Sequence, residues 1–255
     1  LRTNTSYSED GSASVIEHYN GADWKYFDAI KYCTTNTLNF PSGAGCIASY
    51  NLNYNVNDIG NTYNGTNNIV TFNASGKFGA AAVFNGSSSK ITVPDSSDNL
   101  NFSNHIGTIS AWVNLDSISG GEEPIVCKRG SGNPGARSYI FNVTNGVINW
   151  YTFNTDSNSQ QVISTSTISA NTWYHIAVTL DQTNIKIYID GVLDKTASST
   201  YTSIQDDGAD FTIGYRGNNS GFVYADGSID QVRIFNDSLT SDEVSKLYNN
   251  EIACS

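Results

Sequence analysis

The sequence contains no methionine, and its 13 lysines and arginines face 24 aspartates and glutamates. The formal net charge of −11 argues against nucleic acid or an anionic membrane as a partner, since both require clustered cations. No apolar run reaches the length that a membrane-spanning helix needs, so no membrane insertion is predicted. Because methionine is absent even from position 1, we expect Leu1 to be a processed or truncated start.

Apolar and polar residues alternate in the second half of the chain, as they do in β-strands with one buried face. Residues 171–180 and 185–189 alternate in this way, and Asp190-Gly191 follows the second run. Asp-Gly readily adopts the positive φ angles of a primed hairpin turn, so these runs predict consecutive antiparallel strands. Thr240 and Glu243 have capping-box spacing ahead of a short apolar stripe, which predicts one C-terminal helix.

The first 45 residues form a separate element of the sequence. Asn20-Gly21 lies between two segments, 12–19 and 24–32, that are typical of a β-hairpin. An isolated hairpin is marginally stable in water, so it must pack on something. It either docks on the rest of the chain, or it pairs with another subunit or with sequence that precedes it.

Motifs along the remainder of the chain resemble the laminin G-like, concanavalin A-like jelly-roll family. They include Gly76-Lys-Phe-Gly with Phe84-Asn-Gly86, and Trp173-Tyr-His-Ile-Ala. The matching segments follow one another in the order 47–52, 57–61, 76–86, 109–113, 173–179, 187–192 and 227–244. The resemblance implies an all-β fold, an antiparallel β-sandwich (jelly roll) with one short C-terminal helix. We therefore divide the chain into an N-terminal β-hairpin extension at 1–45 and a laminin G-like domain at 46–255.

The resemblance also implies a structural Ca²⁺ ion. Relatives often hold calcium between the opening segment and the strand that contains Asp230, so Asp58, Asn61 and Asp230 are candidate ligands, with the Gly86 carbonyl as a fourth. Calcium prefers such oxygen ligands. Asp58 and Asn61 are equally typical of an Asx turn that needs no metal. Asp230 has the alternative of capping a neighbouring loop or pairing with Arg233.

Aromatic and planar polar residues mark a candidate carbohydrate-binding surface. Sugars stack on aromatic rings and bond planar polar groups. Trp150 and Tyr151 point to opposite faces of their strand, so at most one of them faces a ligand. Any of these aromatic residues that points inward fills the core instead. The candidates are Arg137, Tyr139, Trp150, Tyr151, Tyr215 and Arg216, with the glycine-rich loop 128–136 at the rim.

Four cysteines occur, without a Cys-x-x-Cys pair that would suggest zinc. A disulfide between Cys33 and Cys46 would tether the N-terminal element and contribute roughly 3 kcal/mol for a loop of this size. Such a bridge implies a location outside the reducing cytosol. Cys127 either pairs with Cys254 or is a buried free thiol.

The sequence offers no clear catalytic constellation. Glucanases of this fold use closely spaced acidic residues on one strand, and a retaining glycosidase needs two carboxyl groups about 5 Å apart. The pairs Glu122-Glu123 and Asp206-Asp207 lack Glu-x-Asp-x-x-Glu spacing, and His175 is typical of a packed strand residue. We therefore expect that the protein is not an enzyme.

These patterns favour a non-catalytic, extracellular carbohydrate-binding or adhesive module of a cell-surface or phage-fibre assembly. Its expected partner is a glycan or surface polysaccharide. Two alternatives stay open. One is a structural subunit of a virion or extracellular filament that binds copies of itself through the N-terminal segment. The other is a polysaccharide-active enzyme of the same fold.

Overall fold

The computed structural model describes residues 45–95, 99–119, 121–129, 137–155, 158–205, 208–218 and 221–249, together with 18–19 and 24–25. In the first of two compact units, β1 (His18–Tyr19) pairs antiparallel with β2 (Trp24–Lys25). This short pairing lies within the segments 12–19 and 24–32 that are predicted to form a hairpin, and the predicted turn at Asn20-Gly21 lies outside the described residues. The larger unit spans Asn36–Ala253 and contains all the other strands and the helix.

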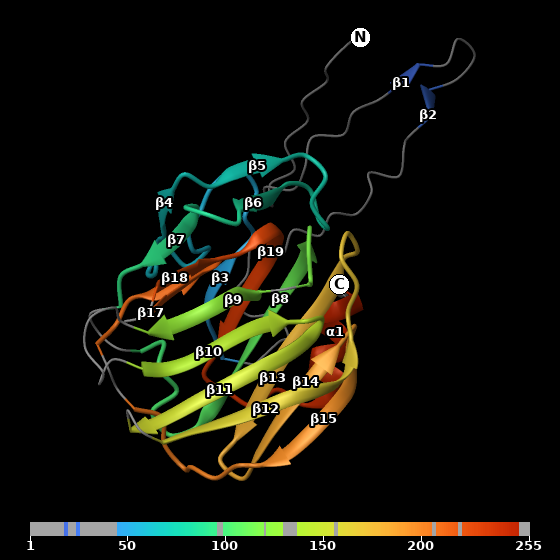
Figure 1. Ribbon diagram of the computed structural model, residues 1–255. Coiled ribbons are helices and arrows are strands. Elements are labelled where there is room, and N and C mark those ends of the chain that lie inside the picture. The colour runs from blue at the N-terminus through green and yellow to red at the C-terminus, as the bar shows by residue number, and fades with distance from the viewer. Residues whose placement is uncertain are drawn as a thin grey trace. The chain divides into compact units, whose positions relative to one another are not determined.

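Two antiparallel sheets form the larger unit, as Figure 1 shows. In spatial order, the seven-stranded sheet contains β12 (Asn158–Thr167), β11 (Val147–Thr155), β10 (Arg137–Thr144), β9 (Glu122–Arg129), β16 (Phe211–Ile213), β7 (Lys90–Val93) and β4 (Thr66–Asn68). The eight-stranded sheet contains β15 (Val192–Ser198), β14 (Asn184–Ile189), β13 (Tyr174–Asp181), β8 (Ile106–Leu115), β19 (Asp226–Phe235), β6 (Ala81–Asn85) and β5 (Thr71–Asn73), and β3 (Cys46–Tyr50) also pairs with β19. A separate hairpin joins β17 (Tyr215–Asn218) to β18 (Gly221–Tyr224).

The main core lies between the two sheets. Strand alternation sends Ile176 and Val178 of β13 into it, where they join Trp150 and Phe141 from the other sheet. Ala177, between them, points to the opposite side and packs in a smaller cluster with the helix. The arrangement confirms the predicted antiparallel β-sandwich.

Turn chemistry sets the register of the last hairpin of this sheet. Asp190 and Gly191 both have positive φ, at 50° and 76°, and they join β14 to β15. Both central residues of a type I′ turn need positive φ, and the twist of this turn matches that of the flanking strands. The Asp-Gly prediction is therefore confirmed.

The helix α1 (Ser241–Asn249) begins at the predicted capping box. The Thr240 amide donates to Glu243 Oε2 at 2.8 Å, and the Glu243 amide donates to Thr240 Oγ1 at 3.3 Å. These two bonds satisfy amides that the first helical turn leaves without a partner. Val244 and Leu247 pack on the outer side of the eight-stranded sheet. Within the described residues, no helix has the length and apolar character needed to cross a bilayer.

A buried ion pair joins three segments of the core. Lys128 Nζ lies 3.1 Å from Asp95 Oδ2, and neither side chain is exposed to solvent. The ammonium also donates to the Ala209 carbonyl at 2.6 Å, while the Leu100 amide donates to the Asp95 carboxylate at 3.0 Å. The pair thus ties β9 to the segments before β8 and before β16. Removing either charge would leave the other buried without its counterion.

We predict that Lys128→Met lowers the free energy of unfolding by about 3–5 kcal/mol, because Asp95 keeps a buried charge without its cation. Chemical denaturation measures this change. The matched control is Lys186→Met, which breaks a half-exposed pair with Asp181 at 3.2 Å. That substitution should cost less than about 1 kcal/mol. Equal losses in the two variants would contradict the prediction.

Candidate functional site

The inward position of Lys128 determines what lies on the outer face of the seven-stranded sheet. Successive side chains of a strand point to opposite faces. Since Lys128 and Val126 point into the core, Cys127 and Arg129 of β9 point outward. Cys127 packs there against Ile140 and Phe153 of the neighbouring strands. This outer face therefore has an apolar floor with charged residues beside it.

Three arginines gather on this face. Arg129 of β9 lies directly opposite Arg137 of β10 in the strand register. Facing residues of an antiparallel pair have Cβ atoms roughly 5 Å apart, and like charges in this arrangement are destabilising. Arg216 comes from the hairpin β17–β18. Burial, together with the charges of Arg137 and Arg216, lowers the pKa of Arg129 to about 10.

Glu122 fixes the third arginine. Arg216 Nε donates to Glu122 Oε1 and Arg216 Nη2 donates to Glu122 Oε2, each at 2.5 Å. Asn142 Nδ2 also donates to Glu122 Oε1, at 2.7 Å. A bidentate pair of this kind gives geometric specificity as well as energy. It attaches the β17–β18 hairpin to the sheet and holds the guanidinium in one orientation.

Two aromatic rings lie beside the arginines. Tyr151 and Phe153 are on the same side of β11, and their rings stack with centroids 6.4 Å apart and an interplanar angle of 14°. The Arg137 guanidinium lies 5.8 Å from the Phe153 ring centroid. Burial raises the pKa of Tyr151, and the nearby Glu122 adds to this effect. We call the surface formed by Glu122, Arg129, Arg137, Tyr151, Phe153 and Arg216 the arginine face.

Three of the six predicted carbohydrate-binding residues, Arg137, Tyr151 and Arg216, lie on the arginine face. The prediction is corrected for Tyr139 and Trp150, which lie wholly inside the core. Tyr139 donates its hydroxyl to the Leu100 carbonyl at 2.6 Å, and its ring stacks on Trp150 at 5.2 Å. Both side chains lie on the inner face of the sheet. They therefore fill the core, which is the alternative role given above for aromatic residues that point inward.

Tyr215, the sixth candidate, is packed among other side chains and is 8% exposed. Lys90 Nζ lies 4.4 Å from its ring centroid, and the rings of Phe222 and Tyr224 are its neighbours. It supports the hairpin and offers little surface to a ligand. The rim loop predicted at 128–136 lies outside the described residues from 130 onward.

Sequence reasoning missed Glu122, Arg129 and Phe153 as members of a site. Arg129 follows Lys128 directly, and two adjacent cations give no sign in the sequence that one is buried and the other faces out. The facing arrangement of Arg129 and Arg137 depends on strand register. Period-two alternation counted from a known inward residue is the signal that could have identified them.

The predicted calcium ligands lie in separate surroundings. The Asp58 carboxylate accepts hydrogen bonds from the amides of Ser49, Thr62 and Tyr63 at 2.9–3.2 Å. Asn61 has φ of 54°, and its amide donates to the Asp58 carbonyl at 2.9 Å. Backbone amides thus fill the space around this carboxylate, which is the chemistry of the Asx-turn alternative.

The other two candidates are on strands of the eight-stranded sheet or at their ends. Gly86 lies against Asp226, and its amide donates to the Ala225 carbonyl at 2.8 Å. Asp230 is buried and accepts a hydrogen bond from the Phe78 amide at 3.0 Å, which caps the 74–80 loop. Burial raises the pKa of Asp230 to about 7. In the described part of the chain, no group of three or more His, Cys, Asp or Glu side chains is arranged to hold a metal ion.

The cysteines are described in part. Cys46 has a free thiol that donates to the Ala48 carbonyl at 3.5 Å, and Cys127 is a buried free thiol. The predicted bridge between Cys33 and Cys46 is not borne out, because Cys46 is a free thiol. Cys33 and Cys254 themselves lie outside the described residues. Burial raises the pKa of the Cys127 thiol. That thiol therefore belongs to the apolar floor of the arginine face as a neutral group.

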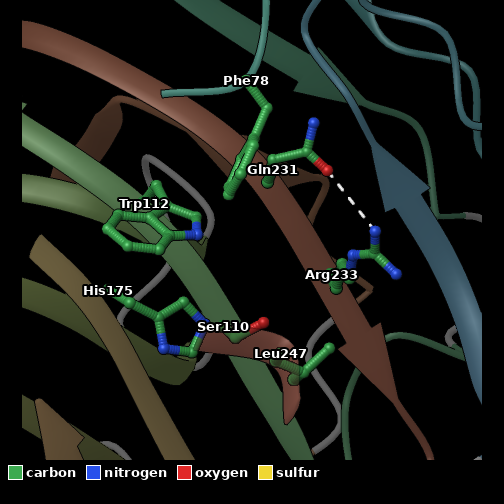
Figure 2. Close-up of a pocket in the computed structure, with 7 residues that line it drawn as sticks. All are labelled: Phe78, Ser110, Trp112, His175, Gln231, Arg233 and Leu247. Atoms are coloured by element: carbon green, nitrogen blue, oxygen red, sulfur yellow. Dashed lines mark hydrogen bonds between the residues drawn. The ribbon is translucent and has the colours of Figure 1, made fainter. Parts of the chain in front are cut away.

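A small cavity lies on the outer side of the eight-stranded sheet. Figure 2 shows the side chains around it, with Arg233 donating to Gln231 Oε1 at 3.4 Å. Its volume of about 10 Å³ is room for one water molecule, so no sugar fits. The lining residues are Phe78, Ser110, Trp112, His175, Gln231, Arg233 and Leu247.

His175 is one of the polar groups at this cavity. It is 2% exposed, which confirms that it is a packed strand residue. Burial, with the charge of Arg233 adding, lowers its pKa to about 3. The imidazole is therefore neutral in the folded protein at neutral pH.

A laminin G-type model of the Concanavalin A-like lectin/glucanases superfamily matches residues 85–245, more than half of the chain. This match confirms the resemblance found in the sequence. No curated protein matches the sequence.

Among solved structures, domain 4 of AbnA, a GH43 extracellular arabinanase from Geobacillus stearothermophilus in complex with arabinotriose, superposes with a TM-score of 0.65. Its identity is 22%, and the match covers 80% of this chain and 98% of that chain. The binding domain of Paraclostridial Mosquitocidal Protein 1 has a TM-score of 0.66 at 21% identity, covering 81% of this chain and 52% of that chain.

A structure of botulinum neurotoxin type C, whose cell entry depends on interaction with two ganglioside molecules, has a TM-score of 0.62 at 17% identity. The match covers 81% of this chain and 51% of that chain. This chain thus spans about half the length of the two toxin structures. At these identities the likeness shows a shared fold.

The low pKa of His175 predicts a pH-dependent stability. Below its ordinary value of 6.5 the unfolded chain takes up a proton at His175 that the folded protein does not, so the contribution of His175 lowers the free energy of unfolding as the pH drops from 6.5 towards about 3. The raised pKa values of Glu123 and Asp230 act in the opposite direction, so the His175 contribution is measured as the difference between wild type and variant. The loss is at most about 1.4 kcal/mol per pH unit. In urea denaturation, the free energy of unfolding of His175→Gln should rise relative to that of the wild-type protein as the pH falls from 6.5 to 4. Parallel profiles for the two proteins would show that His175 is protonated in the fold.

Calcium stays a prediction and has a direct measurement. If Asp58, Asn61, Gly86 and Asp230 bind Ca²⁺, a chelator lowers the melting temperature of the wild-type protein and added Ca²⁺ restores it. Asp230→Asn should then abolish the difference between the two conditions. A melting temperature that is the same with and without chelator would leave Asp58 and Asn61 with the Asx-turn role alone.

Proposed function

Because the chain belongs to the Concanavalin A-like lectin/glucanases superfamily, we propose that it is a non-catalytic, extracellular glycan-binding module of a larger surface assembly. The fold alone does not decide this, since one fold supports many functions. The proposal rests on the side chains of the arginine face.

The observation that carries the proposal is the stacked pair Tyr151 and Phe153 with the fixed Arg216–Glu122 pair beside it. Sugar rings present apolar C–H groups that stack on aromatic side chains, and their hydroxyls bond to planar polar groups. Both kinds of group are held in place before any ligand arrives, because the sheet and the bidentate bond orient them. Preorganised groups lose little conformational freedom on binding.

The structural neighbours add support. The arabinanase domain was solved with arabinotriose, and the botulinum type C neurotoxin interacts with gangliosides. A glycan as partner is therefore consistent with what this fold does in proteins of similar shape.

One observation favours the alternative of a polysaccharide-active enzyme. Burial raises the pKa of Glu123 to about 7, and the charges of Asp226 and Asp116 add to this effect. A carboxylic acid with a raised pKa beside another carboxylate is a pattern found in glycosidases. Against catalysis, the Asp226 amide donates to Glu123 Oε2 at 2.8 Å, which gives Glu123 a structural role in joining β9 of one sheet to β19 of the other.

We predict that Tyr151→Ala weakens glycan binding about tenfold, equivalent to about 1.4 kcal/mol, through loss of the stacking platform. Retardation in native gels that contain arabinan, polygalacturonate or dextran identifies bound polysaccharides, and titration then measures the change. The matched control is Tyr54→Ala, which removes an exposed tyrosine (64% exposed) from a loop outside the arginine face.

No retardation in any gel and no glycan-array signal would contradict the proposed function. Equal binding by the Tyr151 and Tyr54 variants would show that the glycan-binding site lies outside the arginine face. The same mixtures are assayed for new reducing ends, and none is expected. Reducing ends released by the wild-type protein but not by Glu123→Gln would establish the enzyme alternative.

A further inference from the structure

We propose that Asp194 and Gln160 form a single latch that closes one side of the β-sandwich, and that this side opens as a local unit when the latch is released. The side in question lies between β12 and β15, the last strands of the two sheets, and we call it the seam. The inference concerns how the fold is closed, so it does not depend on the proposed function.

The seam is joined by side chains in place of a backbone ladder. β12 ends the seven-stranded sheet and β15 ends the eight-stranded sheet, and the two strands do not pair with each other. An edge strand carries backbone N–H and C=O groups that its own sheet does not use. Residues 158–205 are described without a gap, and the hydrogen bonds that cross the seam within them each involve a side chain.

Asp194 of β15 supplies the first clamp. Its carboxylate accepts hydrogen bonds from the amides of Thr165 at 2.5 Å and Ser166 at 3.0 Å. These amides are available because β12 has a register shift against β11 at this point, and a bulge leaves residues out of the ladder. Hydrogen bonds to a carboxylate are stronger than those between neutral groups. This clamp therefore holds the bulged part of β12 against β15.

Gln160 of β12 supplies the second clamp, in the opposite direction. Its Nε2 donates to the Ser198 carbonyl at 2.7 Å, and its Oε1 accepts from the Thr200 amide at 2.7 Å. Gln160 lies near the start of β12, and Asp194 bonds residues near the end of the same strand. In each clamp one planar group bonds two backbone groups of the facing segment, so the two clamps together fix the distance between the strands at both ends of the seam.

Little else holds the seam. β15 contains no buried residue, and β12 contains two, Val162 and Ser164. A region with few buried contacts and exposed hydrogen bonds opens at a lower free energy than the core does. When one clamp is broken, the other must order two strands alone, and the conformational entropy of the freed strand opposes it. We therefore expect the two clamps to open and close together.

The latched strand also borders the arginine face. Gln161 lies opposite Tyr151 in the strand register, and its Nε2 donates to Asn149 Oδ1 at 2.8 Å. β12 thus supports β11 on the side away from β10. A closed seam holds in register the strand that lies next to Tyr151.

Residue-resolved hydrogen exchange of the native protein tests this inference. Asp194→Ala removes the acceptor of the Thr165 and Ser166 amides, so faster exchange of these two follows from that loss alone. A single latch predicts in addition that the Thr200 amide, which bonds Gln160, exchanges about fivefold faster or more. Gln160→Ala should reciprocally speed exchange of the Thr165 and Ser166 amides.

A urea series on the wild-type protein shows whether the seam opens by itself, even if a variant fails to fold. Low concentrations of urea speed exchange according to the surface that each opening exposes. The seam amides should depend weakly on urea, whereas the Val178 amide in the middle of β13 should follow global unfolding. The matched control is Asp210→Ala, which removes the same charge at an exposed position outside β12 and β15 and should leave the Thr200 amide unchanged.

Three outcomes would overturn the inference. An unchanged Thr200 amide in Asp194→Ala would show that the two clamps act independently. Seam amides as sensitive to urea as Val178 would show that the seam opens only when the whole protein unfolds. Exchange of the Thr165 and Thr200 amides at the rates of an unfolded chain in the wild-type protein would show that no latch forms.

Discussion

The buried ion pair between Lys128 and Asp95 is the constraint on which the rest of the molecule depends. Two charges removed from water are stable only when they meet each other and further hydrogen-bonding groups. Here the Ala209 carbonyl and the Leu100 amide supply those groups, so three segments distant in sequence must be in place together. A one-residue slip of β9 would put Lys128 outside and leave Asp95 alone in the core. The buried ion pair therefore fixes the register of β9 in the sheet.

The same pair decides the character of the opposite surface. With Lys128 inside, Arg129 is outside and faces Arg137, while Cys127 contributes to the apolar floor beside them. The surface that we propose for recognition is therefore a consequence of how the core is charged. A sheet with a leucine at position 128 would have the same alternation, but a one-residue shift in the register of β9 would cost less free energy.

The fold could be predicted from the sequence because its signals are local. Asp190-Gly191 and the Thr240–Glu243 capping box are short motifs whose physics does not depend on distant residues, and the structure has both.

The site could be predicted only in part. Tyr139 and Tyr151 look alike in sequence, yet one bonds Leu100 within the core and the other is half-exposed outside. The difference is set by register and by bulges in β10, which depend on partners more than ten residues away. Arg129 was missed for the same reason.

The Glu122–Arg216 bond spans 94 positions of the chain, and β9, β10 and β11 supply the remainder of the arginine face. No peptide cut from one strand contains more than a fraction of it. The surface is therefore indivisible: its residues come together only in the folded sandwich, and we expect partial unfolding to abolish the proposed recognition at one step. Transfer of the arginine face to another protein, by recombination or by engineering, would require the entire sandwich, whereas a loop graft would carry residues without their geometry.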